Sequence, residues 1–566
     1  MKKFTIIFSL LLSFGMNAGA SDTLKTANHN LEVAKQLEIF ASVYRNIDMV
    51  YVDSLDPSQT IEASINGMLR SLDPYTEYYP PANAKELKSL MTGKYGGIGS
   101  VVSFNVRDNV TVINEPYLGM PAQEAGLRKG DHIIAIDGED MRGKSTTYVS
   151  EHLRGDPGTT FMLTVKRPGE KKERKVKITR RAIQQPAIPY YGMLTGTVGY
   201  INLDQYTEDC SAHFRNALIT LKRKGMTGLV IDLRNNTGGS LSESVNILNM
   251  FLPKDIKLVS TKGKVKRANM EYVTKDLPID TVMPIVCLVS GTTASAAEIT
   301  SGVLQDLDRG VVLGTKTYGK GLVQVPLPLP YNANMKVTTA HYYIPSGRCV
   351  QAINYKRDGR DVVADSLKRE FKTRNGRAVK DGGGIMPDIE LKADTLPNIV
   401  YYMQTAALDS TNVMMDYIVD YVDNHKQIAP AKDFRISDEE YADYCQRAID
   451  AGFKYDRISS TILSELKKVA KMEGYYDRAK AELDALEKKL EHDLASELKF
   501  HSREIRMALE RDIVTCYYYQ EGAIEHMLEY DKQVKEAVNL LGDSERYSSI
   551  LSPKDTEQQP VASEKE

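Results

Sequence analysis

The spacing of apolar and polar residues changes several times along the chain. From residue 21 to 90 the apolar residues recur three and four positions apart, which predicts a helical N-terminal region. From 91 to 183 short alternating runs are separated by Gly and Asp-Gly turns, which predicts a small β-rich domain. The change of period near residue 91 therefore indicates a domain boundary.

Two further parts follow. Between 184 and 395, apolar runs such as "GLVIDLR" and "PIVCLVS" alternate with helical patterns, which predicts an α/β core. From 396 to 550 Gly and Pro nearly vanish, and we expect a helical C-terminal domain. Its clearest apolar stripe comprises Leu483, Leu486, Leu490, Leu494 and Leu498, and because strict heptads do not persist, a bundle is favoured over a coiled coil. Residues 551–566 are polar and predict a disordered tail, so the chain is expected to be a multidomain α+β protein.

The first twenty residues predict a secretory signal peptide. A Lys-Lys start precedes an apolar run of about a dozen residues and the small-x-small sequence from Ala18 to Ala20. A retained membrane anchor is the weaker interpretation, since a span needs about 20 apolar residues. We therefore expect cleavage after Ala20 and an exported protein, located in the periplasm.

Charge and cysteine content narrow the possible partners. The 73 Lys and Arg residues nearly balance the 75 Asp and Glu residues, so no overall field favours nucleic acid. The five cysteines are scattered, without the close spacing of a metal site, and we expect them to be mostly buried apolar residues.

The β-rich domain contains a candidate peptide-binding loop. The backbone N–H groups of Gly96, Gly97, Ile98 and Gly99 can turn toward one anion, such as a terminal carboxylate. Together with "PAQEAGLRKGDHIIAIDGEDM", this stretch resembles a PDZ domain, and the resemblance implies recognition of C-terminal peptides as an added strand. The alternative is that these glycines only form hairpin turns.

Ser295, in "GTTASAAEIT", follows an apolar strand and precedes a helical run. Ser-Ala-Ala-Glu fits a capping box, and a serine in this pattern is usually a helix cap. The same position also suits a nucleophile, because a helix N-terminus supplies N–H groups to a developing oxyanion. Neither His213 nor His341 stands in a recognisable triad motif, so a Ser-His-Asp mechanism is poorly supported.

A lysine can serve as the base instead. In "TKTYGKGLVQVPLPLP", Lys320 lies between two glycines, and strand alternation would place Gln324 on the same side to orient the amine. The pKa of Lys320 must then fall by about 3 through burial, since a free lysine has a pKa near 10.4. Lys320 could equally be a solvated lysine in a turn, as Lys316 nearby is expected to be.

The segment "DLRNNTGGSLSES" supplies a third element. Its glycines, Gly238 and Gly239, allow the backbone to approach a substrate and to aim an N–H at an oxyanion. The same glycines could only turn the chain, with Ser240 capping the next helix. The segment alone does not decide between these interpretations.

In order and spacing, the three segments resemble the carboxyl-terminal processing peptidases, also called tail-specific proteases. Ser295 and Lys320 are 25 positions apart (320 − 295), as in that family, and Thr237 stands where proline is usual. The resemblance implies a crotonase-like α/β peptidase core with Ser295 as nucleophile, Lys320 as general base and Gln324 as the residue that orients the lysine. It also implies that the backbone amides of Gly238 and Ala296 form the oxyanion hole. It covers residues 60 to 395.

The sequence therefore predicts an exported serine endopeptidase that holds protein C-terminal tails and cleaves them with a Ser-Lys dyad through an acyl-enzyme. This mechanism needs no metal or other cofactor. Its substrates would be proteins or peptides with free C-termini, and the C-terminal helices could mediate homo-oligomers or bind an adaptor. The alternatives are a catalytically inactive PDZ scaffold and a crotonase-like acyl-thioester enzyme.

Overall fold

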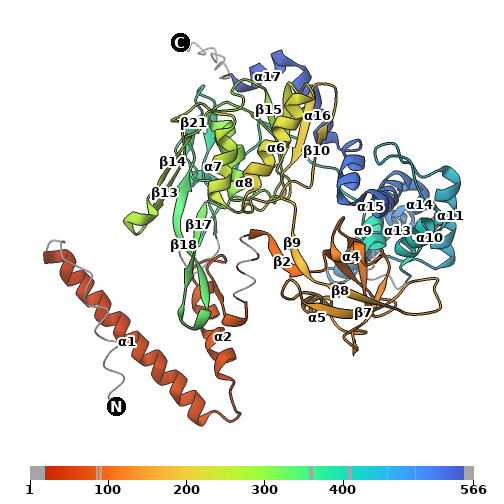
Figure 1. The fold of residues 1–566 in the computed structure, drawn as a ribbon, viewed down its shortest axis with the longest axis horizontal. Coiled ribbons are helices and arrows are strands. Elements are labelled where there is room, and N and C mark those ends of the chain that lie inside the picture. The colour runs from red at the N-terminus through yellow and green to blue at the C-terminus, as the bar shows by residue number, and fades with distance from the viewer. Residues whose placement is uncertain are drawn as a thin grey trace.

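The computed structural model describes residues 20–83, 87, 89, 92–355, 361–405, 411–455, 457–490 and 493–552. The expected signal peptide, apart from Ala20, and most of the expected polar tail lie outside these residues. The described chain folds into a multidomain α+β arrangement (Figure 1), in which the β-rich domain and the C-terminal helices lie together beside the α/β core. No helix among the described residues is both long and apolar enough to cross a membrane.

The N-terminal region is helical, but it also supplies a strand to the core. Its elements are α1 (Ala20–Val50), α2 (Pro57–Arg70) and β1 (Glu77–Tyr79). Asp56 caps α2 by accepting from Gln59 N–H at 3.0 Å, and Pro57 suits the first helical position. Strand β1 pairs antiparallel with β18 (Asn334–Tyr343), and three residues are too few for a periodic pattern to predict it.

The β-rich domain forms a sheet with the order β3-β4-β5-β7-β8, in which β3 is an end strand. In β7, Phe161, Leu163 and Val165 point into the core and alternate with polar or exposed residues. The elements of this domain are β2 (Lys94–Gly97), β3 (Ser100–Asn105), β4 (Val110–Pro116), α4 (Pro121–Glu124), β5 (His132–Ile136), β6 (Glu139–Asp140), α5 (Thr146–Leu153), β7 (Thr160–Lys166), β8 (Arg174–Thr179) and β9 (Arg181–Gln184).

The α/β core is built on a sheet with the order β10-β11-β12-β15-β16-β23, parallel except for β10. Its central strands are buried on both faces, as continuous apolar runs in parallel sheets require. The sheet consists of β10 (Tyr190–Met193), β11 (Val198–Asn202), β12 (Gly228–Asp232), β15 (Ile285–Val289), β16 (Val311–Gly314) and β23 (Ile389–Glu390). Helices α6 (Cys210–Arg223), α7 (Leu241–Asn249) and α8 (Ala296–Asp306) contribute to the main apolar core on one face.

A second, antiparallel sheet extends from the core beside helix α8 (Figure 1). It contains β13 (Lys257–Gly263), β14 (Glu271–Val273), β17 (Leu322–Pro328) and β18 together with β1. Short two-stranded ladders follow: β19 (Ile353–Asn354) with β20 (Asp361–Val362), and β21 (Glu370–Lys372) with β22 (Ala378–Lys380).

The C-terminal helices divide between two packing partners. Helices α9, α10, α11, α14 and α15 surround an apolar core of their own, as in a bundle, and α12 pairs with α13, whereas α16 packs on the second face of the parallel sheet through Val534, Ala537 and Leu540. The leucine stripe predicted on one helical run is shared between α13 and α14, because Asp493 caps a new helix by accepting from Ser496 N–H at 2.7 Å. The helices are α9 (Asn398–Thr405), α10 (Val413–Asn424), α11 (Asp438–Asp450), α12 (Ile458–Met472), α13 (Tyr476–Leu490), α14 (Leu494–Phe500), α15 (Ser502–Leu528), α16 (Lys532–Gly542) and α17 (Ser544–Leu551).

Candidate active site

Ser295 stands on a sharp turn between strand β15 and helix α8. Its φ of 55° and ψ of −117° form a backbone conformation that residues other than glycine rarely adopt. Such strain persists only where the surrounding contacts enforce it. Glu298 Oε2 accepts from Ser295 N–H at 2.9 Å, and Asn236 O accepts from Ala294 N–H at 3.0 Å. Contacts from two sides therefore hold a half-buried serine at the tip of a strained turn, a geometry shared with nucleophilic serines of other folds.

The Glu298 carboxylate joins the Ser295 turn to the segment that carries Lys320. Besides Ser295 N–H, Oε2 accepts from Lys320 N–H at 2.8 Å. Oε1 accepts from the Thr317 hydroxyl at 2.6 Å and from Gly319 N–H at 2.7 Å. Burial raises the pKa of Glu298, and these hydrogen bonds oppose that rise by favouring the carboxylate. The capping-box pattern shows only the local part of this arrangement, since Thr317, Gly319 and Lys320 lie about twenty residues further along the chain.

We expect a Glu298→Gln variant to lose about 2 to 4 kcal/mol of unfolding free energy and at least about tenfold in kcat. A carboxamide has one accepting oxygen, so two of the four donors would face its NH₂ group. Chemical denaturation and peptide cleavage measure the two effects. Glu243→Gln is the matched control, because Glu243 accepts from Ser211 N–H at 2.8 Å, a bond that a glutamine can keep. Equal behaviour of the two variants would contradict this role of Glu298.

The glycines on both sides of Lys320 are required by close backbone packing. A Cβ on Gly319 would lie 2.4 Å from the Cβ of Ala352, and one on Gly321 would lie 2.8 Å from Gln351 N. Gly321 N–H donates to Gln351 Oε1 at 2.7 Å, and Gly319 has φ +88°. The motif "YYIPSGRCVQ" and the residue after it therefore form one wall of the Lys320 loop.

The Lys320 ammonium lies in a largely buried position. Burial, together with the charge of Lys336 nearby, lowers the pKa of Lys320 to about 8. Nζ lies 4.3 Å from the centre of the Tyr75 ring, a cation–π contact with the N-terminal region. Among the described residues, no hydrogen bond joins Lys320 Nζ to Ser295 Oγ. No sequence pattern points to Tyr75, which reaches the site through the segment that leads into β1.

Among the described residues, no hydrogen bond joins Gln324 to Lys320. Its Nε2 donates to the Thr338 hydroxyl at 3.1 Å. The register of β17 against β18 shifts between Val323 and Gln324, and such an irregularity breaks the strict alternation on which the expected geometry depends. The orienting role of Gln324 therefore stays a prediction.

The predicted oxyanion loop lies directly against the Ser295 turn. A Cβ on Gly238 would lie 2.7 Å from Ser295 Cβ and 2.9 Å from Ala296 N, so only glycine fits. Gly238 N–H donates to Asn236 Oδ1 at 2.8 Å, and it is thus not free to bind an oxyanion in this structure. Ala296 N–H, in contrast, has no acceptor among the described residues. The predicted site residues therefore lie on neighbouring segments, but the hydrogen bonds expected between them are not present among the described residues. Each of three residues has another partner instead: Gly238, Lys320 and Gln324.

The candidate carboxylate-binding loop leads into the free edge of the PDZ-like sheet. Gly96 and Gly97 belong to strand β2, which pairs with β9, while Ile98 and Gly99 connect it to β3. No acceptor within the described parts of the chain takes the N–H of Ile98 or of Gly99. Strand β3 ends its sheet and packs near α5, so the free strand edge that an added strand requires is present.

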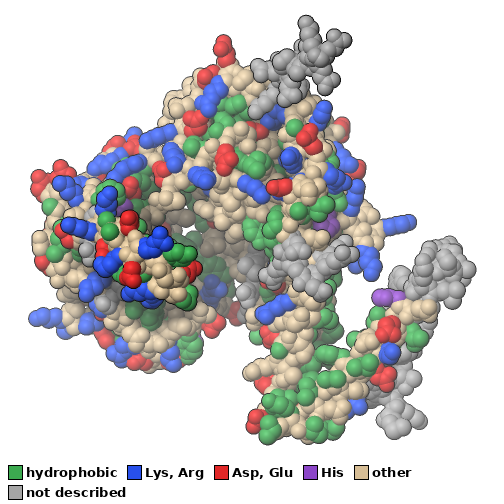
Figure 2. Space-filling view, turned by 180° about the vertical axis from the view of Figure 1, so that it is seen from behind, with side chains coloured by type: hydrophobic (Ala, Val, Ile, Leu, Met, Phe, Trp, Pro, Cys, Tyr) green, Lys and Arg blue, Asp and Glu red, His purple; other side chains and the backbone are tan. Residues whose placement is uncertain are grey.

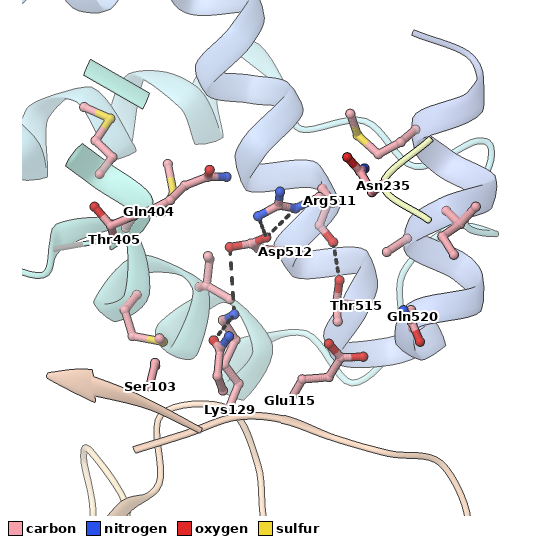
Figure 3. A pocket seen from close by; sticks show the side chains of 18 of the residues that line it. Ser103, Glu115, Lys129, Asn235, Gln404, Thr405, Arg511, Asp512, Thr515 and Gln520 are labelled. Atoms are coloured by element: carbon pink, nitrogen blue, oxygen red, sulfur yellow. Dashed lines mark hydrogen bonds and ion pairs between the residues drawn. The ribbon is translucent and has the colours of Figure 1, made fainter. Parts of the chain in front are cut away.

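A cavity of about 1080 Å³ lies between the PDZ-like edge and the beginning of the predicted oxyanion loop. One wall is the end of β3, from Ser103 to Asn105, and the opposite wall includes Asn235 and Ser290 at the carboxyl ends of the core strands. Figure 3 shows Lys129 of the PDZ-like domain paired with Asp512 of α15 across its lining, at 3.8 Å. Seen from behind, the surface is hollowed between the lobe that contains the PDZ-like domain and the C-terminal helices and the α/β core (Figure 2). We call this space the interdomain chamber.

No group of three or more His, Cys, Asp or Glu side chains is placed to hold a metal ion in the part of the chain that the structure describes. All five cysteines are free, with Cys210 and Cys287 buried and the other three partly exposed.

Three family models match successive parts of the chain. Peptidase family S41 matches residues 197–359, and a PDZ domain matches residues 112–167. A third, described as the C-terminal helical domain of a probable PDZ-protease, matches residues 404–541. The fold and these matches define a serine-type peptidase with a PDZ domain.

Two curated relatives extend the match over most of the peptidase. The carboxy-terminal-processing protease of Bartonella bacilliformis is 35% identical over 351 residues, which cover 61% of this chain and 79% of the relative. Carboxy-terminal processing protease CtpB of Bacillus subtilis is 32% identical over 331 residues, covering 57% and 68%. The chain belongs to the carboxy-terminal processing protease family. The solved photosystem II D1 C-terminal processing protease is 26% identical, with coverage of 64% of this chain and 94% of that one and a TM-score of 0.36.

Proposed function

We propose that this peptidase cleaves proteins near their C-terminal tails with a Ser295–Lys320 dyad. The observation that carries the proposal is the link through Glu298, which holds the strained Ser295 turn beside a buried lysine whose pKa lies near 8. A neutral Lys320 takes the Ser295 proton as the hydroxyl oxygen attacks the peptide carbonyl. The protonated lysine then assists the leaving amine, and water hydrolyses the acyl-enzyme.

The unassembled contacts imply a rearrangement before attack. Lys320 Nζ must leave the Tyr75 ring and approach Ser295, where Gln324 could then orient it. The Gly238 peptide must also turn its N–H away from Asn236, so that it can act with Ala296 N–H on the oxyanion.

Substrate tails would reach the site through the PDZ domain and the interdomain chamber. A tail whose carboxylate binds at Ile98 and Gly99, ahead of β3, must run antiparallel to β3 as an added strand. Its upstream residues then leave β3 near Asn105, where the strand lines the chamber, and Asn235 lies on the opposite wall. We further propose export after removal of residues 1–20 and function in the periplasm. Assembly or adaptor binding through the C-terminal helices also remains a proposal.

Amidation of the substrate's C-terminus is expected to lower kcat/KM about 10- to 100-fold, because it removes the charge that the loop N–H groups would bind. Steady-state cleavage of paired peptides, with free acid and with amide, measures this effect. A Gly99→Ala variant should bring the free-acid peptide down to the rate of the amide. Gly99 has φ +71°, and a Cβ there would lie 2.5 Å from Met120 Cβ. Equal cleavage of acid and amide by the unaltered protein would refute recognition of the terminal carboxylate.

The principal alternative is an inactive PDZ scaffold. It predicts the same preference for free carboxylates in binding, but no turnover. Measurement of both peptide binding and cleavage on the same preparation distinguishes the two functions.

A further inference from the structure

The turn between α15 and α16 contacts the beginning of the predicted oxyanion loop through an ion pair and a hydrogen bond. Arg234 Nη1 lies 2.6 Å from Asp531 Oδ2 and donates to Gln533 Oε1 at 2.8 Å. The Arg234 side chain is 17% exposed and that of Asp531 is 21% exposed, so the ion pair is largely shielded from water. This contact joins residues about 300 positions apart.

Arg234 lies four residues before Gly238, on a segment with little freedom. Its Nε and Nη2 also bind the carboxylate of Asp232, at the end of β12, at 2.9 and 2.5 Å. The next residue, Asn235, has φ 62° and donates its N–H to Ser290 Oγ at 3.2 Å. The side chain of Arg234 thus fixes the point at which the loop leaves the sheet, and a shift there would move Gly238 relative to Ser295.

Asp531 and Gln533, the partners of Arg234, are themselves held in place by several contacts. Asp531 Oδ1 caps α16 by accepting from Gln533 N–H at 2.9 Å and from Val534 N–H at 3.1 Å, which leaves Oδ2 for Arg234. Gln533 is 1% exposed, and its Nε2 donates to Leu391 O. Helix α16 itself is docked on the parallel sheet through Val534, Ala537 and Leu540.

We propose that Asp531 is a positioning residue for the reaction: through Arg234 it holds the oxyanion loop in register with the Ser295 turn. The C-terminal helical domain would thereby contribute to the acylation chemistry without touching substrate. If this contact only fastened the domain to the core, its loss would leave the hydrolysis of a small activated ester unchanged. The inference rests on the proposed serine nucleophile, and its test is chosen to separate the two.

The decisive variant is Asp531→Asn. Asparagine caps a helix as well as aspartate does, so Oδ1 keeps its bonds to α16 while the new NH₂ group faces the guanidinium. The control is Asp394→Asn, which breaks the exposed ion pair between Asp394 and Lys532, the residue next to Asp531, at 2.5 Å. Both variants remove one carboxylate charge that contacts the start of α16 or its partner residue there, but only Asp531 contacts the loop through Arg234.

Two substrates are compared: a tailed peptide and a small activated ester that is too short to span the interdomain chamber. For Asp531→Asn we expect kcat to fall about 10- to 100-fold on both substrates, with KM changed less than about twofold. Peptide binding to the PDZ domain and the thermal midpoint should stay close to those of Asp394→Asn, which should retain full activity.

Unchanged ester hydrolysis by Asp531→Asn would overturn the proposal, whether or not the thermal midpoint drops. A loss confined to the tailed peptide would overturn it as well, since it would place Asp531 in substrate binding. If neither substrate acylates Ser295 of the unaltered protein, the proposed function fails instead. A peptide containing Ser295 whose mass shows no acyl group identifies that case.

Discussion

A Ser295→Ala variant is expected to lose about 10⁴- to 10⁶-fold in kcat, since it removes the hydroxyl on which the proposed mechanism forms the acyl-enzyme. The alanine keeps the backbone of the turn, so we expect the Glu298 contacts and the stability to be retained. Cleavage of a tailed peptide and trapping of the acyl-enzyme by mass spectrometry measure the loss.

Ser301→Ala provides the control within the same helix. The Ser301 hydroxyl is buried and donates to Ala297 O at 2.9 Å, and its removal should leave cleavage nearly unchanged. Retained PDZ binding by Ser295→Ala would show that the loss is chemical. Cleavage by Ser295→Ala at the rate of the unaltered protein would eliminate Ser295 as the nucleophile.

The second large effect is expected at Lys320. Lys320→Met keeps an unbranched side chain in the buried site but removes the base, and we expect kcat to fall at least about 10³-fold. Lys320→Arg should be equally inactive, because a guanidinium stays charged and cannot accept the Ser295 proton. The exposed Lys316 gives the matched control, and Lys316→Met should remain active.

The pH profile of the unaltered protein tests the same role. With a pKa of Lys320 lowered to about 8, the neutral amine is the minor form below that pH and the major form above it. We therefore expect kcat/KM to rise about tenfold per pH unit below 8 and to level off above it. Substantial activity of Lys320→Arg, or a flat profile between pH 6 and 9, would exclude the neutral lysine as base.

The strands and several helices of the core could be read from the sequence because each carries its own pattern. "GLVIDLR" and "PIVCLVS" are continuous apolar runs, and they form the buried strands β12 and β15. The position of Ser295 before a helix follows in the same way from local spacing. The resemblance of the three motif segments then supplied the roles that spacing alone left open.

What could not be predicted depends on contacts between distant residues. Glu298 fits a local capping box, but its bonds to Gly319 and Lys320 depend on how two loops meet. Gln324 lies at an irregularity in the register of β17 against β18, which a strand pattern does not encode. An amphipathic pattern likewise identifies α16 as a helix without showing which surface it covers. The pair of Arg234 and Asp531 follows only from that docking.

The thiol of Cys287 can report on the opening of the α/β core, independently of proteolysis. It lies at the centre of β15 with none of its surface exposed, and burial raises its pKa to about 12. An alkylating reagent can reach this sulfur only when the parallel sheet separates from the helices that cover it. The rate of its modification therefore records spontaneous opening of the α/β core, and no engineered cysteine is needed.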